Sequence, residues 1–385
     1  MIYRTYFLLV IVSATAFFSC KDDDQSGDAD SMEMVDNIDK YEFFRDNEGT
    51  VSFTGQIERA NMLSAIKTYL LSGDAGQIIE ATTLKQAYNN TDNDGGGLFD
   101  FSSTKQLRDK TFQPDLDDDY FGDLFEQAAI ASKAGNSASE GQPGLIERES
   151  KGTSILVNNK GHEFTQFIEK GLMGSVFLNQ VYNTYLTDAR TGDDVDNESI
   201  VEGKNYTLLE HHWDEAFGYF TAPGDFGSDW PELREDEVTY WSKYANVVDP
   251  FIGSNDKIMN AFRQGRAAIV AKDNATKNIN KNILYKELEL VAAGTAIHYI
   301  NQSISALNKG NTGDLLHVLS EAAMFTRALT FSPQRKITPS DLHNIQNVDF
   351  GIEGNFWMVS AEGLNNAKNK IIAAYPSLEV VKDEL

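Results

Sequence analysis

Residues 207–220 read TLLEHHWDEAFGYF, and this stretch indicates most clearly how the body of the chain folds. Thr207 and Glu210 stand three residues apart, which is the spacing of a capping box at the N-terminus of a helix. Behind them, aromatic residues recur at helical steps and form one apolar stripe. The segment therefore predicts a helix whose aromatic face lies in a core. The stripe consists of Trp213, Phe217 and Phe220.

Two polar side chains of this helix are candidate metal ligands. His211 and Glu215 lie one turn apart on the same stripe, while His212 points to the neighbouring face. An imidazole and a carboxylate on one stripe suit a transition metal, provided that a second helix supplies further ligands. Together with Glu163, these residues would form the site of a metal-dependent hydrolase, which is one hypothesis for the chain.

The alternative hypothesis assigns the same helix a structural role. Arg263 and Arg266 lie three residues apart in AFRQGRAAI, residues 261–269, on a helix of their own. They are the expected partners of Asp214 or Glu215, because buried charges occur in proteins mainly as pairs. We favour this hypothesis, in which one of the two acids contacts one of the two arginines and fixes the register of the helices.

A second polar stretch, GHEFTQFIEKGLMG at residues 161–174, does not complete a catalytic motif. His162 and Glu163 would begin the HExxH signature of a zinc protease, but Gln166 stands where the second His is required. The chain also contains no Ser-His-Asp order, no P-loop and no Gly-rich dinucleotide turn. The motifs therefore point to binding more than to catalysis.

The rest of the chain reads as helical, with apolar residues at three- to four-residue steps. Strands are expected only for TVSFTG at 50–55 and SILV at 154–157. We predict a mainly α protein of antiparallel helical bundles, either one large domain over 41–385 or two bundles, about 55–190 and 205–375. The expected helices cover 56–71, 117–133, 161–186, 207–220, 235–247, 254–272, 276–307, 312–330, 339–345 and 360–375.

The N-terminal residues indicate export. Residues 1–19 combine one basic residue with an uncharged apolar run and a small residue before Cys20, which is the pattern of a secretory signal peptide. The apolar run is shorter than the roughly 20 residues of a membrane span. A Cys at the cleavage point resembles the lipobox of bacterial lipoproteins, in which the thiol is acylated. The alternative is an ordinary signal peptide followed by a chance Cys.

Acidic residues follow directly after Cys20. Lys21, Asp22, Asp23 and Asp24 resemble the signal that sends lipoproteins of Bacteroidota to the outer face of the outer membrane. These residues also begin a stretch, 20–40, that is low in apolar side chains and is expected to be a flexible tether. Two or three acyl chains would anchor the protein firmly to a membrane.

The charge of the chain argues against one class of partner. The sequence has 33 Lys and Arg against 58 Asp and Glu, which gives a formal net charge of −25. Such a charge repels phosphate backbones, so we expect no nucleic-acid partner. Cys20 is the only cysteine. If it is acylated, the folded body has neither a disulfide nor thiolate chemistry.

The blocks GHEFTQFIEKGLMG, EHHWDEAFGYF and AFRQGRAAI, behind a lipobox, resemble a family of uncharacterised Bacteroidota lipoproteins. More distantly, the chain resembles the imelysin-like proteins, which are helical-bundle proteins linked with iron acquisition. Their GxHxxE motif ends in a Gly ten residues after the first, and Gly161 and Gly171 have this spacing. Glu163 and Gln166 stand in the places of the motif's His and Glu, so the presumed ligands are altered.

The resemblance implies a surface-exposed outer-membrane lipoprotein that binds a ligand or a partner in nutrient uptake. Uptake of iron is the process that it favours, with a TonB-dependent receptor or an imelysin-like protein as the partner. Two alternatives stay open, namely the metal-dependent hydrolase and a glycan-binding lipoprotein of the SusD-like kind. SusD-like proteins carry tetratricopeptide-like repeats, and no repeat of fixed period is present in this sequence.

Overall fold

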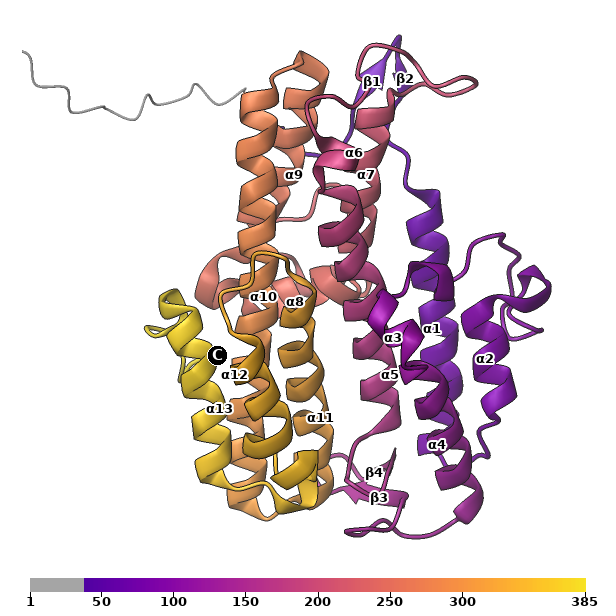
Figure 1. The fold of residues 1–385 in the computed structure, drawn as a ribbon, viewed down its shortest axis with the longest axis vertical. Coiled ribbons are helices and arrows are strands. Elements are labelled where there is room, and N and C mark those ends of the chain that lie inside the picture. Colours follow the sequence, from indigo (N-terminus) through magenta and orange to yellow (C-terminus); the bar gives the residue numbers. More distant parts are fainter. Residues whose placement is uncertain (1–37) are drawn as a thin grey trace, which may run out of the picture. The chain divides into compact units, whose positions relative to one another are not determined.

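The long helix α10 (Asn274–Lys309) is the central element of one group of helices (Figure 1). The computed structural model of the chain describes residues 38–385, which form one compact unit. The connections to the preceding and following helices are two residues long, so both neighbours run antiparallel to α10. The helices that contact α10 are α8 (Tyr240–Ile252), α9 (Ser254–Ala271), α11 (Thr312–Ala328) and α13 (Ala361–Ala374).

A second group of helices lies beside α10 and α11. Helix α5 (Phe164–Leu172) continues through two π-helical segments, η3 (Met173–Leu178) and η4 (Val181–Tyr185), and contacts both α11 and α1 (Thr54–Asp74). Helix α7 (Leu208–Phe220) contacts α1 and α9 and so connects the two groups. Most buried side chains of both groups belong to one continuous core, and a small separate cluster lies between the end of α10 and the start of α11. The remaining α-helices are α2 (Ala81–Asn89), α3 (Gln113–Asp117), α4 (Tyr120–Ala134), α6 (Asp188–Thr191) and α12 (Pro339–Asn344).

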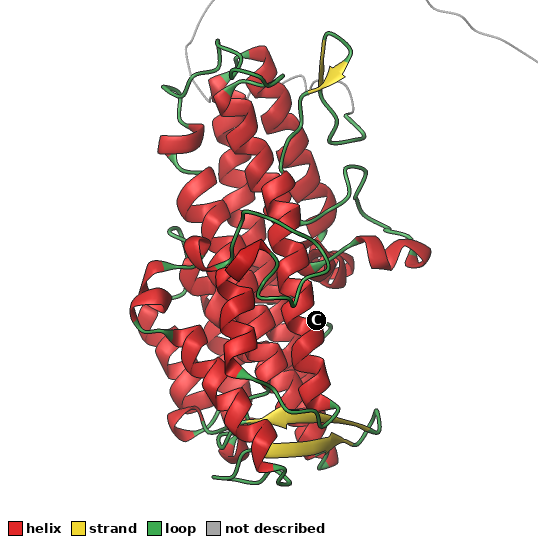
Figure 2. Ribbon diagram, turned by 90° about the vertical axis from the view of Figure 1, so that its right-hand side faces the viewer, coloured by secondary structure: helices red, strands yellow, loops and turns green. Residues whose placement is uncertain are grey.

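The strands of residues 38–385 form two small antiparallel hairpins (Figure 2). Strand β1 (Phe44–Arg45) pairs with β2 (Glu48–Gly49) before α1 begins. Strand β3 (Gly144–Arg148) pairs with β4 (Thr153–Val157) in a five-residue register and lies against α4 and α11. None of the helices in this part of the chain is long and apolar enough to cross a membrane.

The mainly α fold is confirmed, and so is the strand at SILV, which is part of β4. The strand expected at 50–55 is wrong. The N–H of Ser52 donates to the carboxylate of Asp214 at 3.2 Å instead of to a neighbouring strand, and α1 begins two residues later. The apolar alternation there reflects packing of Val51 and Phe53 against the core.

The helix expected over 235–247 starts later than predicted. Thr239 caps α8 and forms a capping box with Ser242, so the helix begins at Tyr240. The acidic residues before it, 232–237, form a 3₁₀ turn. Acidic residues favour a helix N-terminus, and so does a capping threonine. The acids lie before Thr239, which is why the predicted start was too early.

Several predictions concern residues before the described body. The signal peptide over 1–19, acylation of Cys20, the export signal at 21–24 and nearly all of the tether over 20–40 lie outside residues 38–385. These predictions stay open.

The capping box and the aromatic stripe of α7 are both present. The hydroxyl of Thr207 accepts from the N–H of Glu210, whose carboxylate accepts from the N–H of Thr207 at 2.8 Å. The three aromatic residues of the stripe are buried. The indole of Trp213 lies so close to α9 that a Cβ at Gly265 would come within 2.0 Å of its Cζ2 atom. A glycine is therefore required where α7 and α9 approach.

We predict that Gly265→Ala destabilises the protein, whereas Gly294→Ala does not. A methyl group at 265 overlaps the buried indole, which costs about 1–3 kcal/mol and exceeds the helix propensity gained. At 294, in α10, the added Cβ would lie 3.6 Å from Val248, an ordinary contact. Urea unfolding of both variants tests this, and equal stability would contradict the close approach of α7 and α9.

Candidate functional site

Arg266 of α9 binds both inner acids of α7. Its Nε donates to Oδ1 of Asp214 at 3.0 Å, and its Nη1 donates to Oε1 of Glu210 at 3.0 Å. Its Nη2 donates to the hydroxyl of Thr50 at 2.9 Å. The guanidinium and both carboxylates are almost completely buried. The expected contact between an acid of α7 and Arg266 is present. Asp214 forms it, whereas Glu215 faces away from Arg266.

The same acids hold the segment that precedes α1. The hydroxyl of Tyr41 donates to Asp214 at 2.7 Å, and Arg45 donates to Glu210 at 2.9 Å. Burial raises the pKa of Asp214 to about 6, although Arg266 opposes this shift. Since the oxygens of both carboxylates already accept hydrogen bonds, this cluster is a structural clamp and not a ligand site.

His212 and Arg263 also have structural partners. Nδ1 of His212 donates to the carbonyl of Arg190 at 2.8 Å, so its Nε2 accepts from the guanidinium of Arg190 at 3.0 Å. Burial lowers the pKa of His212, which favours this neutral form. Arg263 donates to the carbonyls of Gly224 and Phe226.

His211 and Glu215 do face a cavity, a cleft of about 590 Å³ beside the start of α1. Nδ1 of His211 donates to the carbonyl of Ser52 at 3.0 Å, which leaves Nε2 3.8 Å from Oε2 of Glu215. Glu215 also accepts from Gln56 at 3.2 Å and from Tyr185 at 3.1 Å. The pair therefore lines the cleft, and Nε2 of His211 has Glu215 as its neighbour.

The residues of the metal-dependent hydrolase hypothesis do not come together. Glu163 lies near the far end of α1, where it accepts from His317 at 2.7 Å. Since α1 has 21 residues, about 30 Å separate Glu163 from His211 and Glu215, which lie at the other end of this helix. Within residues 38–385, no group of three or more His, Cys, Asp or Glu side chains is arranged to hold a metal ion.

Cationic side chains predominate around the cleft that His211 and Glu215 line, and we call it the cationic cleft. One of its two carboxylates, Glu58, accepts from the hydroxyl of Ser103 at 2.5 Å, and the other is Glu215. Three lysines that line the cleft form no ion pair with any residue of the described body. The cations are Arg59, Lys105, Lys110 and Lys204.

The N-terminus of α1 adds to the positive potential of the cationic cleft. Thr54 and Gly55, in the first turn, line the cleft, and this turn has neither an acidic residue nor a side-chain cap. The positive end of the helix dipole is therefore not neutralised within this first turn. Lys105 lies over this turn, because a Cβ at Gly55 would meet its Cε at 3.2 Å. The cleft suits an anion.

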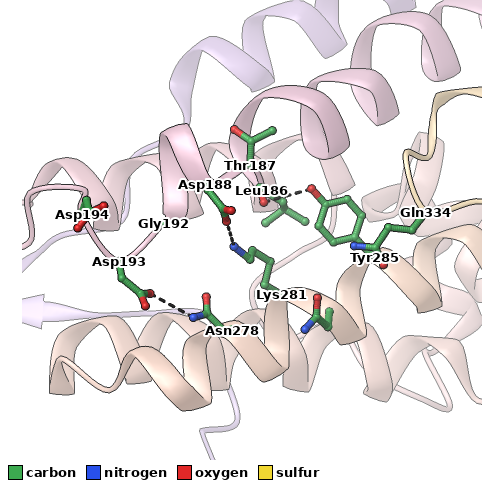
Figure 3. A pocket seen from close by; sticks show the side chains of 11 residues that line it. Leu186, Thr187, Asp188, Gly192, Asp193, Asp194, Asn278, Lys281, Tyr285 and Gln334 are labelled. Atoms are coloured by element: carbon green, nitrogen blue, oxygen red, sulfur yellow. Dashed lines mark hydrogen bonds and ion pairs between the residues drawn. The ribbon is translucent and has the colours of Figure 1, made fainter.

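A groove of about 620 Å³ beside α6 and α10 is slightly larger but less suited to a charged ligand (Figure 3). Lys281 donates to Asp188 at 2.7 Å across this groove, and Asn278 donates to Asp193 at 3.1 Å. Its lysine and two of its three carboxylates therefore already have partners. We therefore take the cationic cleft as the candidate functional site.

Comparison with known proteins gives a family without an activity. A family model described as a domain of unknown function (DUF4856) matches residues 38–376, which is nearly the whole described body. No curated protein and no solved structure matches the chain. The chemistry of the site therefore has to be interpreted from its own residues.

We predict that Arg266→Met lowers the free energy of unfolding by about 3–5 kcal/mol, because it leaves Asp214 and Glu210 buried with less compensation. Glu215→Gln, in α7, should change it by less than about 1 kcal/mol, since Glu215 is partly exposed and the uncharged side chains of Gln56 and Tyr185 donate to it. Urea unfolding measures both. A small effect of Arg266→Met would contradict the structural clamp.

Proposed function

The chain belongs to this DUF4856 family, whose function is unknown, and from that premise we propose that its body binds a small anionic ligand in the cationic cleft. The observation that carries the proposal is an excess of positive charge around one cleft in a chain with a net charge of −25. Four cations line it against two carboxylates. Clefts lined by one sign of charge concentrate ligands of the opposite sign.

The geometry favours lysines as the groups that contact the ligand. Arg59 is buried, donates to the carbonyls of Gln106 and Gly55, and lies 3.8 Å from the carboxylate of Asp109, so its guanidinium is held by the protein itself. Lys105 and Lys204 are exposed at the cleft and can move toward a carboxylate or a phosphate. Hydroxyl groups beside them supply further donors, from Thr54, Ser102 and Thr104.

We propose further that the protein is a lipid-anchored lipoprotein on the outer face of the outer membrane, active in nutrient uptake. Cys20 and the acids that follow it support the anchor and its location. The likeness to imelysin-like proteins favours uptake of iron, with a TonB-dependent receptor or an imelysin-like protein as the partner. Ferric chelates formed by carboxylate ligands are anionic, which agrees with the charge of the cationic cleft.

Binding of citrate to the purified full-length protein tests the proposed site. We expect saturable binding by titration calorimetry that weakens as ionic strength rises. Lys105→Glu should lower the affinity by about tenfold or more, since a hydrogen bond between charged groups contributes about 1.5–3 kcal/mol.

Lys286→Glu is the matched control, because it makes the same change in net charge on an exposed lysine of α10. It should leave citrate binding nearly unchanged. Equal losses in the two variants would mean that only the net charge matters, and this result would refute a site in the cationic cleft.

The anchor and its location make a separate prediction. Cys20→Ala should release the protein from membranes, because no helix of residues 38–385 can span one. Replacing Asp22, Asp23 and Asp24 with Ala should keep acylation but move the protein to the periplasmic face. Palmitate labelling and protease treatment of intact cells measure these outcomes. Unchanged protease accessibility in the triple variant would show that the acids are only a tether.

A further inference from the structure

The far end of α1 borders a second cavity, of about 520 Å³, with a different chemistry. Polar side chains from three helices contribute to its lining: Asp74 from the last turn of α1, Glu163 and Gln166 around the start of α5, and His317 from α11. Strands β3 and β4 add Arg148, Thr153 and Ser154. Apolar side chains, among them Leu71 and Leu145, form other parts of its wall. We call this cavity the acidic pocket.

Asp74 is a nearly buried carboxylate without a cationic partner. Its Oδ1 accepts from the N–H of Leu156 at 2.7 Å, and its Oδ2 accepts from the hydroxyl of Thr165 at 2.8 Å. No Lys, Arg or His of the described body lies within ion-pair distance of it. Burial and the nearby charge of Glu163 raise the pKa of Asp74 to about 7. Near neutral pH this carboxylate is therefore only partly ionised, and a cation beside it would stabilise the ionised form.

The two cations that line the acidic pocket already have carboxylate partners. His317 donates from Nδ1 to Glu163 at 2.7 Å, and its Nε2 lies 3.5 Å from Glu321. Burial alone would lower the pKa of His317, but its hydrogen bond to Glu163 raises it above the ordinary value. Arg148 of β3 donates to Asp314 at 3.3 Å. Neither of these cations therefore forms an ion pair with Asp74.

Gln166 provides a second, independent sign of a missing donor. Only 6% of this residue is exposed, and its Nε2 donates to Glu163 at 3.2 Å, which fixes the orientation of the amide. Its Oε1 then has no hydrogen-bond donor within residues 38–385. A buried acceptor without a donor is unfavourable, so a ligand that donates an N–H to it would gain binding free energy.

The direction of α1 agrees with a cationic ligand. The acidic pocket lies at the C-terminus of this helix, which is the negative end of its dipole. The last turn contains no basic residue that could compensate this end. A positive group bound beside Asp74 would therefore be stabilised by the helix as well as by the carboxylate.

We propose that the acidic pocket binds the primary ammonium group of a small alkylamine. An ammonium has three N–H donors and no acceptor, which matches acceptors on Asp74, Glu163 and Gln166. The alkyl chain would lie on Leu71 and Leu145. The size of the pocket is that of a small-molecule site. This inference is independent of the anion proposed for the cationic cleft, because the two cavities share no residue.

Calorimetric titration of the full-length protein with n-butylammonium tests this inference. n-Butanol, which lacks the charge, and tetramethylammonium, which lacks N–H donors, should both bind at least about tenfold more weakly. Since Asp74 must be ionised to bind the cation, affinity should rise about tenfold between about pH 6 and pH 8. The charged groups that face Asp74 are Glu163, His317 and Arg148.

Three variants complete the test. Asp74→Asn should abolish binding of n-butylammonium. Asp188 is an exposed acid in the groove beside α10, and Asp188→Asn should change neither the affinity for n-butylammonium nor the dependence of that affinity on pH. If Asp74→Asn does not fold, Gln166→Leu decides, and it should lower the affinity by about fivefold or more. Butanol binding as tightly as n-butylammonium, or no measurable binding of the amine, would overturn the proposal. Unchanged affinity in Gln166→Leu would overturn it as well.

Discussion

The buried contact between Arg266 and Asp214 is the interaction on which the arrangement of this protein depends. It joins α9 to α7, and the same carboxylate binds Tyr41 and the backbone of Ser52. The segment before α1 is thereby held against α7, and this fixes where α1 starts. The cationic cleft, which lies between the first turn of α1 and the outer face of α7, follows from that placement.

Helix α1 gives the described body two cavities of opposite character. Its N-terminus, at Thr54, lines the cationic cleft, and its C-terminus, at Asp74, lines the acidic pocket. The helix dipole has the matching sign at each end. Figure 1 shows α1 running from below the β1–β2 hairpin to α4 and the β3–β4 hairpin, so the two cavities lie at separate ends of one rigid element. A ligand at one end would not obstruct the other.

The sequence predicted the fold well and the site only in part, for physical reasons. Helices follow from local periodicity and caps, so the box at Thr207 and Glu210 placed α7 correctly. Of the polar residues in that helix, His211 and Glu215 were rightly singled out as a pair, but their setting was not foreseen. The lysines of the cationic cleft come from the connection between α2 and α3 and from that between α6 and α7, and Asp74 resembles any acid near a helix end. Its burial and lack of a partner are tertiary properties.

The most direct measurement for the central claim is a crystal structure of the full-length protein soaked in selenate, an anion whose selenium is located by anomalous scattering. We expect an anomalous peak in the cationic cleft, within hydrogen-bond distance of Lys105 or Lys204 and near the first turn of α1. An ordered selenate elsewhere on the protein, with the cationic cleft left empty, would contradict this expectation.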